Sequence, residues 1–309
     1  MYKRMAGYII YNGFWNTAPS DPVRRLAEAA KRRGVALTPS PNTAFVQQIA
    51  PTVAVSCGDR QLTSADFVIF WDKDTRLAQA LGACGVRVYN SAAAVAACDD
   101  KSETHRLLAS HGVPMPRTML APMAYTKVTE AVEPFLTAAE CCLGYPMVVK
   151  ECYGSFGEQV YLAENGEDLR RVVYQMDGRK FLLQEFVAAS AGRDVRLYVI
   201  GDAVAASICR CSETDFRANV ELGGTVTPHQ PTQQEVALAM RCRQILGLDF
   251  CAVDLLYGSD GQPLVCEVNS NAYMKGLIAG TGVDVADGIV DYVLKKENLN
   301  GRSEDRVCQ

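Results

Sequence analysis

The amino-acid sequence predicts an α/β protein of two or three structural units, and three observations lead to this fold class. Apolar strand-like runs alternate with helical patterns over residues 1 to 90, which is the order of a mainly parallel sheet covered by helices. Beyond the middle of the chain, apolar runs are joined in pairs by short glycine-containing turns, which is typical of antiparallel hairpins. A proline-rich stretch at residues 113–122 lies between the two patterns and is typical of a connector between domains. With 309 residues, the chain is long enough to bury the cores of such units.

The elements of the first unit follow from the spacing of its apolar residues. A helix is predicted from Asp21-Pro22 to Gly34, because proline is favoured at the first helical position and glycine just after the last. The remaining alternation predicts strands at 6–13, 35–41, 52–58, 65–74 and 86–90, and helices at 75–85 and 91–112. No GxGxxG stretch is present, so the dinucleotide-binding fingerprint is absent.

The rest of the chain is predicted to contain two hairpins. One spans residues 193–211 and turns at Gly201-Asp202, and the other spans 250–271 and turns at Asp260-Gly261. The other predicted elements are helices at 129–142, 167–176, 234–247 and 280–298, and strands at 145–153, 158–165 and 180–187.

Composition excludes several classes of protein. Hydrophobic residues make up 49% and charged residues 21%, which is ordinary for a folded globular protein. The formal net charge of −4 does not support an overall electrostatic attraction to nucleic acid. The twelve cysteines show neither CxxC pairs nor Cys/His ligand spacing, so reduced thiols are expected instead of a disulfide framework or a zinc site. Because the sequence also lacks a signal peptide and a membrane-spanning apolar run, a cytoplasmic protein is expected.

Polar side chains alternate with apolar ones along the run LVCEVNSN, residues 264–271. A two-residue turn at Asp260-Gly261 pairs Asp254 with Glu267 across the hairpin, and Asn269 points to the same face as Glu267. Two facing carboxylates in apolar surroundings require positive charge between them. Three oxygen donors suit magnesium or manganese, whereas an ion pair with Arg or Lys of a neighbouring helix explains the carboxylates equally well.

A second group of polar residues surrounds the segment YPMVVKECYGSFG, residues 145–157. Lys150 ends an apolar strand, and the glycines that follow allow backbone N–H groups to approach an anion. No GxxxxGK[ST] stretch is present, and a plain hairpin turn that carries a lysine is the alternative. The run FLLQEFV is compatible with a core strand or with an edge strand whose backbone contacts a purine. The arginines near apolar strands are compatible with phosphate contacts or with solvated salt bridges.

In their order along the chain, these segments resemble ATP-grasp proteins of the RimK-like glutamate ligase type. The resemblance runs from about residue 90 to residue 295 through CDDKSETHRLLASHGVPMPRT, VVKECYGSFGEQVYL, QEFV, GRDVRLYVIG, DFRANVELGG, VDLL and VCEVNSN. It implies an ATP-grasp fold: an N-terminal α/β (pre-ATP-grasp) domain at 1–90, a linker helix and central subdomain at 91–187, and a C-terminal subdomain with the metal site at 188–309.

The resemblance also implies roles for individual residues. Residues matching those that bind the nucleotide are Lys101 and Lys150 at the phosphates, Gly154, Ser155, Phe156 and Gly157 in the loop above them, Gln184, Glu185, Phe186 and Val187 at adenine, and Asp194 at ribose. Residues matching those that face the triphosphate and the reacting carboxylate are Arg196, Arg217 and Asn219. Residues matching the magnesium ligands are Asp254, Glu267 and Asn269.

The activity that the resemblance implies is an ADP-forming, ATP-dependent carboxylate–amine ligase that works through an acylphosphate. It would add glutamate or a similar amino acid to a small molecule, a peptide or a protein tail, with ATP and two Mg²⁺ ions, or Mn²⁺, as cofactors. A small-molecule kinase and a nucleotide-binding protein without ligase activity are the alternatives. Binding to nucleic acid or to a membrane is not expected. Many members of the family associate as dimers or tetramers, so the resemblance allows a homodimer or homotetramer. The first 90 residues match only in their α/β pattern, which leaves the substrate open.

Overall fold

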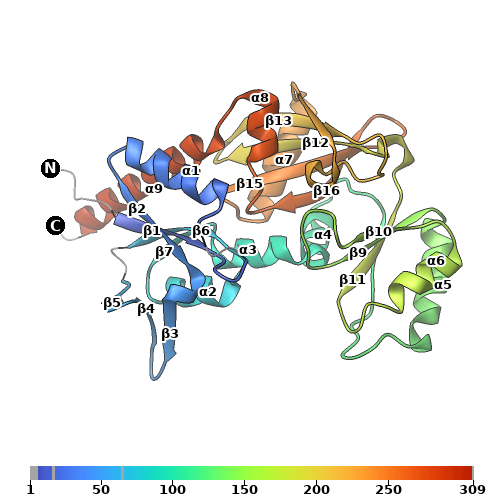
Figure 1. The fold of residues 1–309 in the computed structure, drawn as a ribbon, viewed down its shortest axis with the longest axis horizontal. Coiled ribbons are helices and arrows are strands. Elements are labelled where there is room, and N and C mark those ends of the chain that lie inside the picture. Colours follow the sequence, from blue (N-terminus) through green and yellow to red (C-terminus); the bar gives the residue numbers. More distant parts are fainter. Residues whose placement is uncertain (1–5, 16–17, 64–65, 308–309) are drawn as a thin grey trace.

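The computed structural model describes residues 6–15, 18–63 and 66–307, and three successive stretches of chain each form one larger sheet (Figure 1). The first sheet is parallel and has the strand order β2-β1-β6-β7. Its strands and connecting helices are β1 (Ala6–Tyr11), α1 (Asp21–Arg32), β2 (Ala36–Pro41), β6 (Phe67–Trp71), α2 (Thr75–Ala83) and β7 (Arg87–Tyr89). The predicted parallel α/β layer is therefore confirmed; residue 65 of the strand predicted at 65–74 lies outside the described residues.

The parallel arrangement determines which residues meet at the edge of the sheet. Tyr11 lies opposite Trp71 at the carboxyl ends of β1 and β6, so Asn12 and Asp72 follow at the same edge. A separate three-stranded sheet between β2 and β6 is formed by β3 (Phe45–Ile49), β4 (Val53–Cys57) and β5 (Arg60–Gln61). Of these strands, the sequence predicts only the one that becomes β4.

The predicted single helix over residues 91–112 is wrong. The structure has α3 (Ala92–Asp99) and α4 (Lys101–Ser110), separated at Asp100. Asp100 adopts an extended conformation with φ −90° and ψ 103°, and its carboxylate accepts a hydrogen bond from Ser102 N at 3.0 Å. Aspartate is a favoured N-cap because its side chain satisfies a backbone N–H that the helix leaves free. The break places Lys101 at the first residue of α4.

The second sheet is antiparallel, with the order β10-β9-β11-β8. Its elements are β8 (Thr118–Leu120), α5 (Glu133–Leu143), β9 (Met147–Glu151), β10 (Val160–Ala163), α6 (Gly166–Val173) and β11 (Phe181–Glu185). Buried residues of α5 and α6, among them Leu136 and Leu169, pack with β9 and β11 in one core. Pro134 lies in the first turn of α5, where a missing N–H costs nothing.

The third sheet is antiparallel and has the order β14-β13-β12-β15-β16. Its elements are β12 (Arg193–Ile200), β13 (Ala203–Cys211), β14 (Thr225–Pro228), α7 (Gln233–Ile245), β15 (Phe250–Tyr257), β16 (Pro263–Asn269), α8 (Lys275–Thr281) and α9 (Val285–Val307). Both predicted hairpins are present, whereas α8 is an additional helix that the sequence reading does not predict. Within the described part of the chain, no helix has the length and apolar character needed to cross a membrane.

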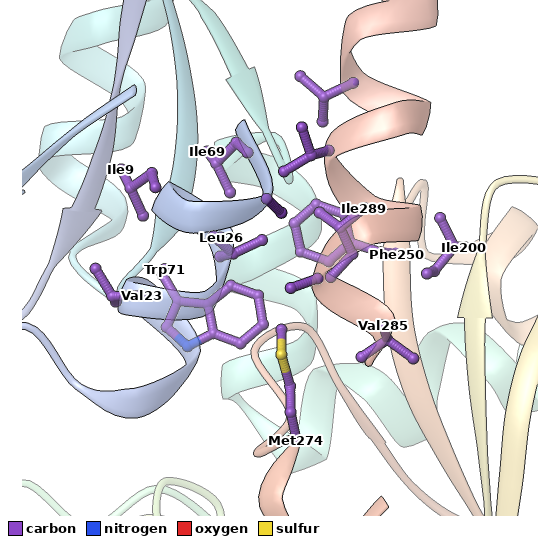
Figure 2. Packing of buried hydrophobic residues seen from close by; sticks show 14 of the residues in the cluster. Ile9, Val23, Leu26, Ile69, Trp71, Ile200, Phe250, Met274, Val285 and Ile289 are labelled. Carbon is purple, nitrogen blue, oxygen red and sulfur yellow. The ribbon is translucent and has the colours of Figure 1, made fainter. Parts of the chain in front are cut away.

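One core joins the first and third sheets (Figure 2). The rings of Trp71 and Phe250 stack with 6.0 Å between their centroids, and Ile289 of α9 belongs to the same cluster. Arg33, at the end of α1, forms ion pairs with two aspartates of α9. The N-terminal region is thus held against the C-terminal sheet by a shared core and by ion pairs, and the division of the chain at residues 90 and 187 stays a prediction.

Candidate active site

A cavity of about 350 Å³ lies where the three sheets meet, and every residue that the sequence reading places in the site is part of its lining. The lining combines the carboxyl edge of the first sheet, the loop between β9 and β10, the end of β11, and the faces of β12, β15 and β16. Residues more than 150 positions apart in the sequence therefore meet in one enclosed space. Their individual roles stay predictions.

The β15–β16 hairpin supplies the three predicted metal ligands. Asp254 lies directly opposite Glu267, as predicted, but the predicted two-residue turn is wrong, because the strands leave a loop of residues 258–262. Gly258 N donates to Gln262 O and Gly261 N to Gly258 O within this loop. A β-bulge at Cys266 then shifts the register by one residue and restores the pair.

Arginines neutralise the carboxylates on this face. Asp254 accepts two hydrogen bonds of 2.7 Å from Arg196 and one of 2.9 Å from Arg210. Asp194 accepts two of 2.6 Å from Arg210, so both of its oxygens contact arginine, while its predicted role at ribose stays a prediction. Burial alone would raise the pKa of Asp254, but Arg196 and Arg210 outweigh burial and lower it to about 2. Asp254 is therefore an anion at neutral pH.

Arg210 is a site residue that the sequence reading misses. A two-residue turn at Gly201-Asp202 would place Cys209 opposite Asp194. A bulge after Tyr198 shifts this register, so that Arg210 lies opposite Asp194 and reaches Asp254 as well. The spacing of residues contains no signal for such a bulge, and counting from the turn leads to the wrong partner.

Glu267, the other carboxylate of the predicted metal site, has a lysine as its counter-ion. Lys101 Nζ lies 3.2 Å from a Glu267 oxygen. Burial opposes ionisation of Glu267, but the charge of Lys101 outweighs it and lowers the pKa of the carboxyl. Asn269 Nδ2 is buried without a hydrogen-bond partner. Two carboxylates and an amide oxygen form a hard donor set, which fits Mg²⁺. Among the described residues, no group of three or more His, Cys, Asp or Glu is placed to hold a metal, so Asn269 would have to be the third ligand.

Lys150, at the end of β9, is the buried cation on the opposite wall. Its Nζ lies 3.6 Å from Cys266 Sγ. No carboxylate in the described ranges forms an ion pair with it, although it is only 7% exposed. A buried ammonium without a counter-ion is costly, which favours a site that receives an anion.

The loop after β9 is held by side chains from three other parts of the chain: the segment after β6, the start of α4 and the segment after β13. Arg217 donates to Gly157 O at 2.6 Å, Lys101 donates to Gly154 O at 3.3 Å, and Lys73 lies 3.3 Å from Ser155 Oγ. Gly157 has φ +75°, and a Cβ there would come within 2.9 Å of Asn219 Oδ1. Glycine is required at this position because the backbone approaches a neighbouring side chain closely in a left-handed conformation.

In the segment predicted to contact adenine, the polar side chains of Gln184 and Glu185 bind other residues of the protein. Gln184 Nε2 donates to Thr118 Oγ1 at 2.8 Å and to His105 Nε2 at 3.1 Å, and Glu185 pairs with Arg117 at 2.6 Å. Phe186 and Val187 line the cavity next to Val148, Phe216 and Leu256. The apolar side of the cavity suits an aromatic base, while the adenine roles stay predictions.

The first sheet contributes residues that the sequence reading does not assign to the site. They are Tyr11, Asn12, Trp15, Trp71, Asp72 and Lys73, which lie in or after the carboxyl ends of β1 and β6. Ligands in open α/β sheets bind outside this edge, so the available signal is the position directly after a predicted parallel strand. Trp15 and Tyr273 also contact Phe156, with ring centroids 6.0 and 5.2 Å away.

Comparisons with known proteins show which family and which fold the chain resembles. A family model described as "RimK-like ATP-grasp domain" matches residues 98–293. The chain is 34% identical over 284 residues to a probable alpha-L-glutamate ligase of Stenotrophomonas maltophilia (strain K279a), covering 88% of this chain and 94% of the relative. It is 35% identical over 228 residues to human N-acetylaspartylglutamate synthase A, covering 72% and 56%. The crystal structure of a RimK domain protein ATP-grasp from Sphaerobacter thermophilus DSM 20745 superposes with a TM-score of 0.71 at 25% identity, covering 93% of this chain and 98% of the other.

Proposed function

Because the chain belongs to the RimK-like ATP-grasp family, we propose that it is an ATP-dependent carboxylate–amine ligase that adds glutamate to a carboxylate substrate and forms ADP. The relatives named as glutamate ligases and the ATP-grasp architecture support this activity.

The observation that carries the proposal is the charge arrangement of the cavity. Lys150 is buried without an anionic partner, and the hard donors of the β15–β16 hairpin lie on the facing wall next to Cys266, which Lys150 contacts. An unpaired cation opposite oxygen ligands suits a triphosphate chelated to Mg²⁺. Two such ions, with Mn²⁺ as a substitute, are the expected complement.

The residues of the chain would act by binding and positioning. Lys101 and Lys150 would bind phosphate oxygens, and the loop 154–157 would cover them and exclude water. Asp254, Glu267 and Asn269 would hold Mg²⁺, which neutralises charge on the transferring phosphoryl group when bound. Arg196, which donates to both oxygens of Asp254, would orient the reacting carboxylate or a phosphate oxygen with its remaining N–H groups.

The reaction has two balanced steps. An oxygen of the carboxylate substrate attacks the γ-phosphorus of ATP, the bond to the β-phosphate oxygen breaks, and ADP leaves. The amine of glutamate then attacks the acyl carbon, phosphate leaves, and the amine loses a proton as the amide forms. The protein supplies orientation and charge and no covalent nucleophile.

Phosphate release with mass spectrometry tests the proposal. The purified chain is mixed with ATP, Mg²⁺, glutamate and pools of carboxylate metabolites. We expect free phosphate, ADP and a product mass equal to the two substrates less one water. Lys150→Gln should reduce turnover by about 100-fold, because it removes one preorganised charge from the phosphate site. Transfer of phosphate to a substrate without amide formation would make the protein a kinase, and a lack of turnover with every pool would contradict a small-molecule acceptor.

A further inference from the structure

Asp72 differs from the other carboxylates that line the cavity. Five carboxylates each form an ion pair, namely Asp99 with Lys73, Glu185 with Arg117, Asp194 with Arg210, Asp254 with Arg196, and Glu267 with Lys101. For Asp72, no cation among the described residues forms such a pair. The nearby cation Lys73 lies 2.6 Å from Asp99 instead. Asp72 is thus the lining carboxylate whose charge the described protein leaves unbalanced.

The position of Asp72 explains why it is well fixed. It directly follows β6 and is only 5% exposed. Its Oδ1 accepts hydrogen bonds from Lys73 N at 2.7 Å and from Asn12 Nδ2 at 3.2 Å. Its Oδ2 is buried and has no hydrogen-bond partner. Burial raises the pKa of this carboxyl, as expected for a carboxylate that lacks a counter-charge.

Asn271 presents a second unsatisfied acceptor in the same cavity. Asn271 Nδ2 donates to the backbone oxygen of Asp72 at 2.9 Å, and this contact fixes the orientation of the amide. The remaining atom, Oδ1, is buried without a partner. Two acceptors on hydrogen-bonded residues of one cavity therefore lack donors, and a single group that satisfies both must carry at least two N–H or O–H bonds. Only a cationic donor would also balance the carboxylate.

We propose that Asp72 and Asn271 form the subsite that binds the ammonium group of the amino-acid substrate. An ammonium group offers three donors and one positive charge, which is the complement of this pair. The assignment rests on the proposed ligase function. Asn271 lies two residues beyond Asn269, so the subsite adjoins the metal ligands, where the amine must arrive to reach the acyl carbon. The first sheet would thereby contribute to the choice of the amine substrate.

A protonated Asp72 offers a competing explanation, because a neutral carboxyl could donate from Oδ2 to Asn271 Oδ1. This alternative needs no ligand. The substitution Asp72→Asn separates the two, since asparagine keeps the shape and donor capacity of a neutral carboxyl but removes the negative charge.

The test compares glutamate with glutarate, which lacks the ammonium group. Their binding to the full chain is measured by isothermal titration calorimetry with a non-hydrolysable ATP analogue and Mg²⁺, together with KM for glutamate and for ATP. Glutamate should bind the wild-type chain about 100-fold more tightly than glutarate, and Asp72→Asn should abolish this difference. KM for ATP should stay within twofold, and the melting temperature should not fall, because the variant removes an unpaired buried charge. The exposed Asp59→Asn, in the same region, is the matched control.

Three results would overturn the subsite: equal affinity of the wild type for both ligands, no binding of glutamate, or unchanged affinity for glutamate in Asp72→Asn. The last result would identify Asp72 as a neutral structural partner of Asn271. Failure of the ligase proposal is a separate outcome, because it removes phosphate release and leaves ammonium-dependent binding of glutamate measurable.

Discussion

Two walls of the cavity differ in how their charges are balanced. On the wall formed by β12, β13, β15 and β16, Asp194, Asp254 and Glu267 all pair with Arg or Lys within the protein. On the wall formed by β9 and the following loop, Lys150 is buried without an anionic partner. The first wall is thus organised before any ligand arrives. On the second wall, Lys150 attracts Glu267 without forming an ion pair with it, so its ammonium group is available to contact an anionic ligand.

Substitutions on the two walls should therefore affect activity in different ways. Replacing a carboxylate on the paired wall removes a proposed metal ligand and leaves a cation without its partner. Replacing a loop residue changes how the second wall closes and leaves the paired charges in place.

The largest effect is expected for Glu267→Gln on the paired wall. The variant keeps the shape of the side chain but removes the charge that Lys101 contacts at 3.2 Å and that Mg²⁺ would require. The kcat for amide formation should fall by about 1,000-fold, equivalent to about 4 kcal/mol of activation free energy. Circular dichroism should show an unchanged fold. The control is Asp260→Asn, an exposed carboxylate at the tip of the same hairpin, and near-normal turnover of Glu267→Gln would refute the metal assignment.

The paired wall also shows how far the sequence predicts the site. The resemblance to ATP-grasp ligases selects Asp254 and Glu267, and the alternation of LVCEVNSN places Glu267 and Asn269 on one face. Counting from a two-residue turn yields the right pair for the wrong reason, since a longer loop and the bulge at Cys266 compensate each other. The same method fails for Arg210, where no second change offsets the bulge.

The first sheet shows what the sequence does not predict, namely contacts between residues of different sheets. Periodicity predicts β1, β6 and α1 well, because apolar spacing reflects local geometry. It does not predict that Asp72 and Asn271 meet, since their contact depends on how two sheets dock around the core of Trp71 and Phe250. The break between α3 and α4 is a similar case, because Asp100 acts as an N-cap inside a continuous helical pattern.

The second effect concerns His105, on the helix that contacts both walls. Lys101 of α4 contacts Glu267 on one wall and Gly154 O on the other. Two hydrogen bonds hold His105: its Nδ1 donates to Lys101 O of the same helix at 2.7 Å, and its Nε2 accepts from Gln184 of β11. Burial, followed by the charge of Lys150, lowers the pKa of His105 to about 4, while the Lys101 carbonyl and Glu267 oppose this shift.

The sign of the pH dependence follows from this shift. Between about pH 6.5 and pH 4, the unfolded chain binds a proton at His105 that the folded chain does not, so stability falls as the pH falls. The full contribution is about 3 kcal/mol and is present above pH 6.5. Urea unfolding at several pH values in this range measures the free energy of unfolding of the wild type and of His105→Gln. This free energy should depend less steeply on pH in the variant. An equal pH dependence of the unfolding free energy in the two proteins would contradict a neutral His105.

The smallest effect is expected for Gly157→Ala on the loop wall. The glycine has φ +75°, which strains any other residue, and the added Cβ would lie 2.9 Å from Asn219 Oδ1, so the Asn219 side chain or the loop that Arg217 contacts must shift. A shift of this kind costs about 1 to 2 kcal/mol, and KM for ATP should rise by about tenfold while the paired charges stay intact.

Gly34→Ala distinguishes this local effect from general backbone strain. Gly34 has φ +72°, and a Cβ there would meet nothing within 4 Å. Its replacement should lower the melting temperature by a few degrees and leave KM for ATP unchanged. An equal rise of KM in both variants would mean that lost stability, and not the position of the loop, determines nucleotide binding. The contrast between the walls would then no longer hold, because the loop would behave like any other strained turn of the chain.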